Sequence, residues 1–299
     1  MTPGTPTAAL ATSDEGAAHD DDLPLATAAL AEAGVRAEVV RWDDADVDWG
    51  GFDLVVVRSC WDYTWREQEF LRWAERVPRL HNPLPVLRWN ADKTYLRDLA
   101  ARGCPVVPTV WDPSSADELP QAAEWVVKPS VSAGSRDTAR WTDRADVLAH
   151  AGALRSAGRT VMVQPYLDAV DVAGETALLH FGGAFSHAVR KGPLLRRGEG
   201  VHQDRMGRED LRAVTARPDQ LELAAAALAA VPAVLGRDAP LLYARVDVVD
   251  GPDGAPVLLE LELVEPSLFL PHDDGAATRF AAAVAAEAGL SRPRPPGPR

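Results

Sequence analysis

Two neighbouring apolar segments in the last third of the chain carry charged residues at alternate positions. The segments are 241–249 and 256–265, the loop DGPDGA lies between them, and the charged residues are Arg245, Asp247, Glu260 and Glu262. Because alternate residues of a strand share a face, each pair projects to one side. We expect a hairpin in which Asp250 lies opposite Val257. Asp247 is then opposite Glu260. Arg245 is opposite Glu262.

Carboxylates that meet on one face of a hairpin repel one another unless a cation compensates them. Mg²⁺ is typically held by one or two carboxylates together with phosphate oxygens of a substrate. The pattern therefore indicates a magnesium site at Asp247, Glu260 and Glu262. The leucines between and beside the two glutamates should lie on the opposite face; they are Leu259, Leu261 and Leu263. The alternative is that the acids form the solvent-exposed face of an amphipathic hairpin.

Lysine is rare in this chain. Of its 31 basic residues only three are lysines: Lys93, Lys128 and Lys191. A lysine on a solvated surface is easily exchanged for arginine, whereas a site that needs a compact ammonium group does not accept a guanidinium fork. Since lysines bind phosphates as point charges, we expect at least two of the three to be functional. The alternative is that so small a number arose by chance.

A loop of small residues follows one of these lysines. Lys128 ends an apolar segment, and the loop PSVSAGSR (129–136) comes next. Its serines and its glycine offer hydroxyls and backbone amides to a phosphate; they are Ser130, Ser132, Gly134 and Ser135. The chain has neither a P-loop motif nor a G-x-G-x-x-G run after its first strand, which disfavours a P-loop NTPase and a dinucleotide-binding protein.

Other polar residues are candidates for substrate contacts. The segment RSCWDY (58–63) ends a buried strand, where ligands of open α/β sheets bind. Arg58 could bind a substrate carboxylate and Asp62 an ammonium group. Alternatively, Arg58 and Asp62 pair with each other beside Trp61. His202, in the segment GEGVHQD, and Ser267, after the second hairpin, complete this set.

The first part of the chain alternates strand and helix signals, which is typical of an open parallel sheet. Strand-like segments at 8–13 and 35–42 enclose a helix with apolar periodicity over 23–33. The segment 53–59 is a continuous apolar run, as in strands buried on both faces. A helix over 64–77 follows it. Its aromatic residues are Trp65, Phe70 and Trp73.

The middle of the chain predicts a helix over 90–103, with Asn90 as its N-cap and Gly103 at its end. A further helix is expected at 143–157. Short strands are expected at 106–111, 124–129, 137–141 and 160–167.

The last third predicts hairpins and then helices. A first hairpin over 175–191 should turn at Gly182 and Gly183, and the second carries the charged pairs. Alanine-rich helices are expected at 218–234 and 273–289. The proline-rich tail, 291–299, should be disordered.

Composition narrows the class of protein. The chain has 299 residues, of which 46% are hydrophobic and 25% charged, which is typical of a soluble globular protein. A net charge of −13 argues against nucleic acid or an anionic membrane as partner. The sequence has no apolar run of the ~18–20 residues that span a bilayer, and its first residues lack the features of a signal peptide. We expect a cytoplasmic protein, and a homodimer, since two-fold dimers are the commonest oligomers.

Taken in order, these motifs resemble those of the ATP-grasp ligases over roughly residues 90–270. The matching segments are NADK with Lys93, VVKP with Lys128, the small-residue loop, VQPYL, and the acids of the second hairpin. The resemblance implies a mixed α/β (α+β) ATP-grasp fold in three parts. An N-terminal open α/β domain would cover 1–90, a small lid subdomain 91–165, and a C-terminal antiparallel-sheet subdomain 166–290.

The resemblance also implies roles for individual residues, with ATP and Mg²⁺ as cofactors. Arg245 would stabilise the transferred phosphoryl group and the acyl intermediate, and the three acids would hold Mg²⁺. Lys93 and Lys128 would hold phosphates beneath the loop, the backbone from Gln164 to Leu167 would face adenine, and Glu175 would bind ribose. The full nucleotide set is Lys93, Lys128, Ser130, Ser132, Gly134, Ser135, Gln164, Tyr166, Leu167 and Glu175.

Two positions depart from the family pattern. Glu262 stands where the family usually has asparagine, which adds a negative charge to the metal site. Ala177 stands where some relatives have an arginine, so that an anion-binding role would pass to Arg190 or Lys191 at the end of the following strand. We take Lys191 as a catalytic candidate and Arg190 as a substrate-binding candidate.

Within this superfamily the whole chain is most similar to the D-cycloserine synthetase family, in length and in its RSCWDY, HNP and HAVRKGPL segments. That similarity implies activation of a substrate carboxylate as an acyl phosphate, followed by ring closure within one small amino-acid-like molecule, O-ureido-D-serine. One alternative is a ligase that joins a carboxylate and an amine of two molecules, as glutathione-synthetase-like or peptide ligases do. Another is a nucleotide-binding regulator without catalysis.

Overall fold

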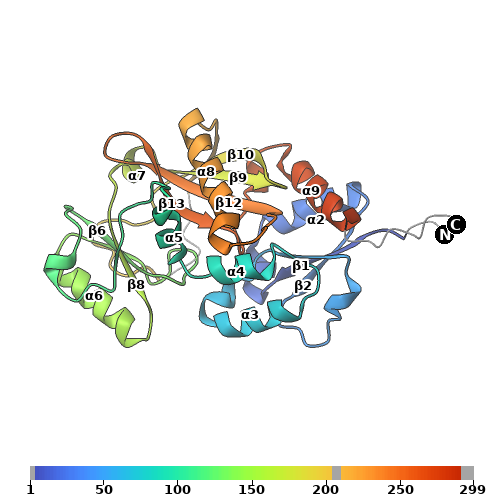
Figure 1. The fold of residues 1–299 in the computed structure, drawn as a ribbon, viewed down its shortest axis with the longest axis horizontal. Coiled ribbons are helices and arrows are strands. Elements are labelled where there is room, and N and C mark those ends of the chain that lie inside the picture. Colours follow the sequence, from blue (N-terminus) through green and yellow to red (C-terminus); the bar gives the residue numbers. More distant parts are fainter. Residues whose placement is uncertain (1–3, 204–209, 291–299) are drawn as a thin grey trace.

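The computed structural model describes residues 4–203 and 210–290 and contains three β-sheets (Figure 1). The predicted disordered tail, 291–299, lies outside the described residues. The first sheet is parallel, in the order β2-β1-β3-β4. Its strands are β1 (Thr7–Thr12), β2 (Arg36–Arg41), β3 (Leu54–Val57) and β4 (Leu80–His81). The apolar run at 53–59 is confirmed as a strand, and all four residues of β3 are buried because the sheet is covered on both faces.

Helices and short turns connect the strands of this sheet. They are α1 (Asp14–His19), α2 (Asp22–Glu32), η1 (Trp49–Gly51), η2 (Trp61–Trp65) and α3 (Glu67–Arg76). The predicted aromatic helix begins later than expected, because residues 61–65 form the 3₁₀ turn η2. Phe70 and Trp73 are buried in the core, as their helical spacing predicts. Trp65 precedes α3 and is exposed instead.

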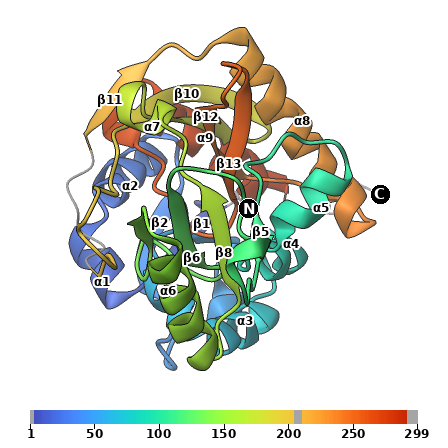
Figure 2. The ribbon, with the colours of Figure 1, turned by 90° about the vertical axis from the view of Figure 1, so that its left-hand side faces the viewer.

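The second sheet is antiparallel, in the order β5-β8-β6-β7, and α6 packs on it (Figure 2). Its elements are β5 (Val110–Trp111), η3 (Ala116–Glu118), β6 (Trp125–Pro129), β7 (Ala139–Trp141), α6 (Arg144–Ser156) and β8 (Val161–Pro165). Asp143 caps α6, its carboxylate accepting a hydrogen bond from the Ala145 amide. The apolar residues of β6, β8 and α6 form a small separate core.

The third sheet has the order β11-β10-β9-β12-β13. Its elements are α7 (Ala169–Val172), β9 (Glu175–Phe181), β10 (Ala184–Lys191), β11 (Leu211–Val214), α8 (Pro218–Leu235), β12 (Tyr243–Asp250), β13 (Pro256–Glu262), η4 (Leu270–His272) and α9 (Ala276–Leu290). Both predicted hairpins are confirmed. Gly182 and Gly183 have φ values of 56° and 80°, the left-handed backbone that a tight two-residue hairpin turn requires.

The first and third sheets share one core. Leu10 and Leu54 of the parallel sheet belong to the same buried cluster as Phe181 of β9 and Phe280 and Val284 of α9. Helix α9 therefore packs against β3 of the first sheet and against β9 and β10 of the third, beside α2 (Figure 1). The division into domains at residues 90 and 165 stays a prediction.

Within residues 4–203 and 210–290, one helix, α8, is long and apolar enough to cross a membrane by length and composition alone. In the structure it packs against β13 and α5, and Leu223, Ala227 and Val231 belong to the core beneath it.

The predicted helix over 90–103 is shorter, α5 (Tyr95–Ala101), and a separate helix, α4 (Leu84–Asn90), precedes it. Asn90 is the last residue of α4, and the N-cap prediction is wrong. Its buried side chain accepts a hydrogen bond from the Leu263 amide and donates one to the Leu261 carbonyl, at 2.7 and 2.8 Å. Asn90 therefore bonds backbone groups that are distant in the sequence and does not cap the start of a helix.

These bonds belong to a set that closes the outer edge of β13. The Leu261 amide donates to the Tyr95 hydroxyl at 2.8 Å, and the Asn82 side-chain amide donates to the Leu263 carbonyl at 2.9 Å. Asn82 is fully buried and also bonds the backbone of β12. The chain has only two asparagines, and both serve here. An edge strand exposes unpaired backbone groups. Here the backbone of residues 105–107 pairs with Leu258, and side chains bond the groups beyond it.

We expect Asn90→Ala to lower the free energy of unfolding by about 2–4 kcal/mol, because it leaves two buried backbone groups without partners. Tyr95→Phe removes one such bond and should lower it by about 1–2 kcal/mol. Urea denaturation with an unchanged slope measures both values. Equal stability of Asn90→Ala and the wild type would show that this edge does not need its side-chain partners.

Candidate active site

Two cavities meet between the three sheets. The larger, of about 370 Å³, lies between the first sheet and the segment after β13, and the smaller, of about 160 Å³, lies between the second and third sheets. Seven residues line both: Lys93, Ser132, Ala133, Gly134, Arg245, Glu260 and Glu262. A group bound in one cavity can therefore meet a group bound in the other at this junction.

The predicted pairing of the second hairpin is confirmed at the charged residues. Arg245 pairs with Glu262, and Asp247 pairs with Glu260. The register then shifts by one residue at a bulge, so that Asp250 lies opposite Pro256 and not opposite Val257. A bulge places an extra residue on one strand and bends it.

The bulge changes the direction of one leucine. Leu261 and Leu263 are buried in the core on the α8 side, as predicted. Leu259 instead lines the smaller cavity, and its expected place beside them is wrong.

Every carboxylate of the predicted metal site is paired with a cation of the chain. Asp247 binds Lys191 Nζ at 2.8 Å and Arg245 Nε at 3.0 Å. Glu262 also binds Arg245, and Glu260 binds Lys93 Nζ at 3.0 Å. The protein's own lysines and arginine thus supply the positive charge that the sequence pattern led us to expect.

Burial and charge set the protonation of these acids. Burial raises the pKa of Asp247 and of Glu260, but the neighbouring cations outweigh it and hold both below their usual range. For Glu262 burial prevails: it raises the pKa to about 8, against the opposing effect of Arg245 and with a further increase from Glu260 and Asp247. Glu262 is therefore largely protonated at neutral pH.

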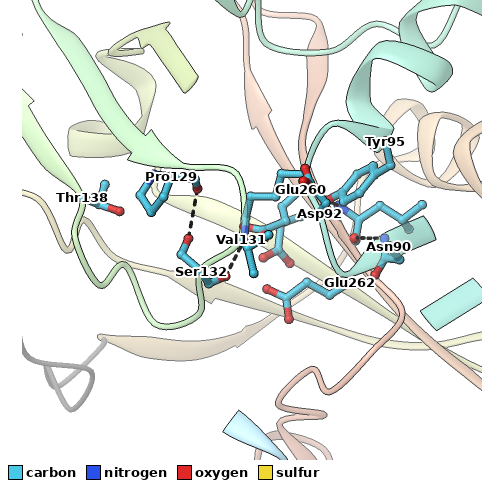
Figure 3. Close-up of polar contacts among 12 residues, drawn as sticks. Asn90, Asp92, Tyr95, Pro129, Val131, Ser132, Thr138, Glu260 and Glu262 are labelled. Atoms are coloured by element: carbon cyan, nitrogen blue, oxygen red, sulfur yellow. Dashed lines mark hydrogen bonds and ion pairs between the residues drawn. The ribbon is translucent and has the colours of Figure 1, made fainter. Parts of the chain in front are cut away.

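The donor set suits Mg²⁺ only in part. Glu260 and Glu262 line both cavities, and Figure 3 shows their carboxylates on the side where Ser132 lies. Asp247 is 1% exposed and lines neither cavity. Within residues 4–203 and 210–290, no three His, Cys, Asp or Glu side chains are grouped closely enough to hold a metal ion. Two carboxylates facing the junction still match the ordinary Mg²⁺ pattern of one or two carboxylates plus phosphate oxygens.

Lys128 is the exception among the charged groups. It lines the smaller cavity and is 9% exposed, and among the described residues no acceptor lies within hydrogen-bond or ion-pair distance of its ammonium group. Burial lowers its pKa, partly offset by the charge of Glu260. A buried ammonium without a contact partner is unfavourable in the ligand-free protein and favours binding of an anion.

The predicted nucleotide residues divide into two groups. Ser132, Gly134, Ser135, Tyr166, Leu167 and Glu175 line the smaller cavity, together with Lys93 and Lys128. Gln164 and Ser130 do not line it. The Gln164 side chain turns away and donates to the Thr109 hydroxyl at 2.9 Å. The Ser130 carbonyl accepts a bond from the Lys93 amide, so this serine supports the lysine's backbone.

The two alternatives for the anion-binding role are separated by strand alternation on β10. Lys191 points into the smaller cavity, where it binds Asp247 and Glu175, the latter at 2.9 Å. Arg190 points the other way: it donates to the Ala173 carbonyl and lies 3.3 Å from Asp210. A substrate role for Arg190 is therefore not supported.

Arg58 and Asp62 do not line either cavity, and the prediction that they contact substrate is not supported. Arg58 is completely buried, donates to the Pro266 carbonyl at 2.8 Å and lies 3.7 Å from Asp22. Asp62 accepts bonds from the Trp42 indole and from Arg66. The alternative prediction, an ion pair between Arg58 and Asp62, is not found either, because each of these two side chains contacts other groups.

Ser267 lines the larger cavity, and its carbonyl accepts a bond from Arg245 at 3.2 Å. His202 lines neither cavity; its backbone pairs with Thr138 beside the loop.

Sequence reasoning missed one wall of the larger cavity. It is formed by residues 19–22, from the end of α1 to the start of α2, and by Glu265, Phe269 and His272 after β13. Asp22 joins the two segments, because its carboxylate accepts bonds from the Leu268 and Leu270 amides at 2.6 and 2.7 Å. The run of three aspartates at the start of a helix was the sequence signal that could have indicated this wall. A run of acidic residues more often lies on a solvent-exposed face, so this signal is weak.

Comparisons with known proteins agree with this architecture. Residues 8–84 match the family model of the N-terminal domain of D-cycloserine synthetase DcsG. The chain is 43% identical to the cycloserine biosynthesis protein DcsG of Streptomyces lavendulae, over 89% of this chain and 93% of that protein. The chain belongs to the D-cycloserine synthetase family. As a member of this family the protein is a ligase.

Solved structures give the same result for the fold. The crystal structure of D-cycloserine synthetase DcsG aligns with a TM-score of 0.87 and 41% identity, over 94% of this chain and 99% of that one. D-alanine–D-alanine ligase from Bacillus anthracis, in complex with ATP, aligns with a TM-score of 0.65 and 12% identity, over 96% and 98% of the two chains. The fold of this D-cycloserine synthetase family member is thus the ATP-grasp fold, as its motifs predicted.

We expect Lys128→Arg to raise the KM for ATP about 10–100-fold, because a guanidinium fork does not replace a point charge on phosphate. Steady-state kinetics and nucleotide titration measure the change. Lys128→Met serves as the comparison. It should bind nucleotide no better than Lys128→Arg does. It should also raise the free energy of unfolding measured without nucleotide, because it removes a buried charge that has no contact partner among the described residues. Normal use of ATP by Lys128→Arg would contradict the role of this lysine.

The pKa of Glu262 predicts a pH dependence of metal binding. Because this carboxyl holds a proton below about pH 8, Mg²⁺ must displace that proton, and its affinity should rise with pH up to about 8 and then level off. Calorimetric titration of Mg²⁺ in the presence of ADP, in two buffers of different ionisation enthalpy, measures the proton released. Glu262→Gln should lose this dependence; an equal slope in both proteins would contradict the assignment.

Proposed function

We propose that the protein is an ATP-dependent C–N ligase that closes the ring of O-ureido-D-serine in D-cycloserine biosynthesis and releases ADP and phosphate. The observation that carries the proposal is the junction of the two cavities. Lys93, Arg245, Glu260 and Glu262 line both, so a nucleotide in one cavity and a substrate carboxylate in the other can exchange a phosphoryl group there. The names of the DcsG relatives supply the identity of the product.

The smaller cavity would hold ATP. Tyr166 and Leu167 would contact the base, and Glu175 would bind the ribose. Lys128 would bind phosphate with its ammonium group, which has no acceptor among the described residues. Lys93 would hold a second phosphate position, since it lies where the two cavities join.

The metal would be held by the two glutamates that face the junction. Glu260 and Glu262 offer the hard oxygen ligands that Mg²⁺ prefers. When bound there, Mg²⁺ neutralises the negative charge that develops on a transferring phosphoryl group. Asp247 would act from behind, because it fixes Arg245 and Lys191 through the bonds described above.

The larger cavity would hold the amino-acid substrate, with its carboxylate at the junction beside Arg245. In the first step a carboxylate oxygen bonds to the γ-phosphorus, and the bond from phosphorus to the β,γ-bridging oxygen breaks to release ADP. In the second step the ureido nitrogen attacks the acyl carbon. The C–N bond forms, the carbon–oxygen bond to phosphate breaks, and the nitrogen's proton leaves with the phosphate.

Ring closure gains from proximity, because the nucleophile and the activated carbon belong to one molecule. The new ring still carries a carbamoyl group on its nitrogen, and D-cycloserine results when water removes this group as carbon dioxide and ammonia. Arg245 is placed to stabilise charge in both steps, since its guanidinium group lies between Asp247, Glu262 and the Ser267 carbonyl.

The test is release of ADP with Mg²⁺ and ATP against a panel of substrates. The panel contains O-ureido-D-serine, its L-enantiomer, and pairs of amino acids or short peptides, and mass spectrometry identifies the products. ADP and a cyclised, phosphate-free product from the D-compound alone support the proposal. ADP only when a separate acid and amine are both present would replace it with an intermolecular ligase. No ADP with any member would favour a nucleotide-binding regulator.

We expect Glu260→Gln to reduce turnover by about 10³-fold or more while ATP binding changes by less than about tenfold. The amide keeps the size of the side chain and removes the charge that the metal requires. Rapid-quench turnover and nucleotide titration separate the two quantities. Unchanged turnover in this variant would remove Glu260 from the metal site.

A further inference from the structure

The loop of residues 130–136 makes one contact that neither the nucleotide nor the substrate explains. The guanidinium carbon of Arg136 lies 4.7 Å from the centre of the Trp65 ring. Trp65 ends η2, and two other residues of that turn, Trp61 and Tyr63, line the larger cavity. The contact therefore joins a wall of the larger cavity to the loop that borders both cavities.

Trp65 is not a core residue, although the sequence places it in an aromatic helix with Phe70 and Trp73. Its side chain is 51% exposed even with Arg136 against it, whereas Phe70 and Trp73 are buried. A large aromatic ring left on the surface gains little from burial, and its electron-rich face is free to attract a cation. The cation that meets it belongs to the loop.

The loop and the residue that follows it contain left-handed backbone. Gly134, Ser135 and Asp137 have φ values of 60°, 57° and 56°, in the left-handed region. This region is unfavourable for residues other than glycine, and such residues keep it only when surrounding contacts impose it. Arg136 lies between Ser135 and Asp137. A contact of its side chain with another part of the protein therefore restrains the backbone of both neighbours.

The loop has contacts on two sides. On one side the Asp137 amide donates to the His202 carbonyl at 2.8 Å, and Arg159 lies 3.7 Å from the Asp137 carboxylate. On the other side Val131 packs against the core of the first sheet, and Arg136 stacks on Trp65. The Trp65 contact thus connects the loop to the N-terminal part of the chain, in addition to Val131 and to the bonds from Lys93 to the Ser130 and Ser132 carbonyls.

We propose that Trp65 and Arg136 form a latch that keeps the 130–136 loop closed over the junction while an acyl phosphate is present. The proposal rests on the function proposed above. If the loop opens, water reaches the acyl carbon, its oxygen bonds there, and phosphate leaves to regenerate the free carboxylate. ATP is then consumed without ring closure. Trp65 is therefore a positioning residue that acts through the loop and not through contact with substrate.

The test compares two variants that replace Trp65 by smaller apolar side chains of similar size, one aromatic and one aliphatic. Trp65→Phe keeps an aromatic face for the arginine, and Trp65→Leu keeps only apolar bulk. We expect Trp65→Leu to raise the KM for ATP about three- to tenfold and to release more ADP per ring closed than the wild type, and Trp65→Phe to restore both values largely. Arg97→Ala is the control, because Arg97 stacks on Trp111 at 4.4 Å, away from both cavities. It should change neither value.

A double variant tests whether the two side chains act together. Arg136→Ala combined with Trp65→Leu should be no worse than Arg136→Ala alone, because one change already breaks the latch. Independent, additive effects would overturn the proposal. So would a Trp65→Leu enzyme that matches Trp65→Phe in both KM and the ratio of ADP to product.

Amide hydrogen exchange of residues 130–136 distinguishes failure of the latch from failure of the proposed function. It is measured on the full chain with and without ADP, and it requires no turnover. Faster exchange in Trp65→Leu than in Trp65→Phe supports the latch even if the wild type forms no ADP with O-ureido-D-serine. Equal exchange rates in the two variants overturn the latch whatever reaction the enzyme performs.

Discussion

The arrangement of the active site depends on how the outer edge of β13 is closed. This strand carries Glu260 and Glu262, and it lies at the edge of its sheet. The backbone of residues 105–107 pairs with Leu258, and the backbone groups beyond it are bonded by the side chains of Asn82, Asn90 and Tyr95. Each side chain is fixed in its own segment of the fold, so the strand cannot slide by one residue without losing these bonds. The two glutamates are thereby held in a constant position relative to the first sheet.

Charge compensation is the second constraint on the junction. Glu260 and Glu262 line it, Asp247 is buried behind them, and each of the three has a lysine or arginine partner. In the proposed mechanism, binding of ATP and Mg²⁺ would therefore exchange these partners for phosphate and metal. Lys128 has no contact partner among the described residues, which would make it the first group available to an incoming phosphate.

Much of this site could be predicted from sequence because strand periodicity is a strong signal. The alternation in the second hairpin predicted the pairs Arg245–Glu262 and Asp247–Glu260, and the scarcity of lysine indicated Lys93, Lys128 and Lys191. The bulge at Leu259 could not be predicted, since alternation fixes a register only until an extra residue interrupts it. The buried environment of Arg58 also could not, because a strand buried on both faces gives no sign of which face meets a cavity.

The role of Asn90 shows a different limit. Asparagine before a helical pattern is a good local reason for an N-cap, but the backbone groups that need Asn90 lie about 170 residues later in the chain. The scarcity argument that was applied to lysine applies equally to asparagine: the chain keeps only two, and both close the edge of β13. The acidic wall before α2 has the same explanation, because Asp22 is fixed by amides after β13.

The shared core of the first and third sheets has a consequence for biosynthesis of the protein. Leu10 and Leu54 are synthesised early, whereas their core neighbours Phe280 and Val284 belong to the last helix. At ~5–20 residues per second, a ribosome needs on the order of 10–40 s to translate from β3 to α9. During that time α2 covers part of this face of the N-terminal sheet, but α9 and the third sheet are still missing. The nascent N-terminal segment therefore exposes the remaining part of its apolar face until translation reaches α9.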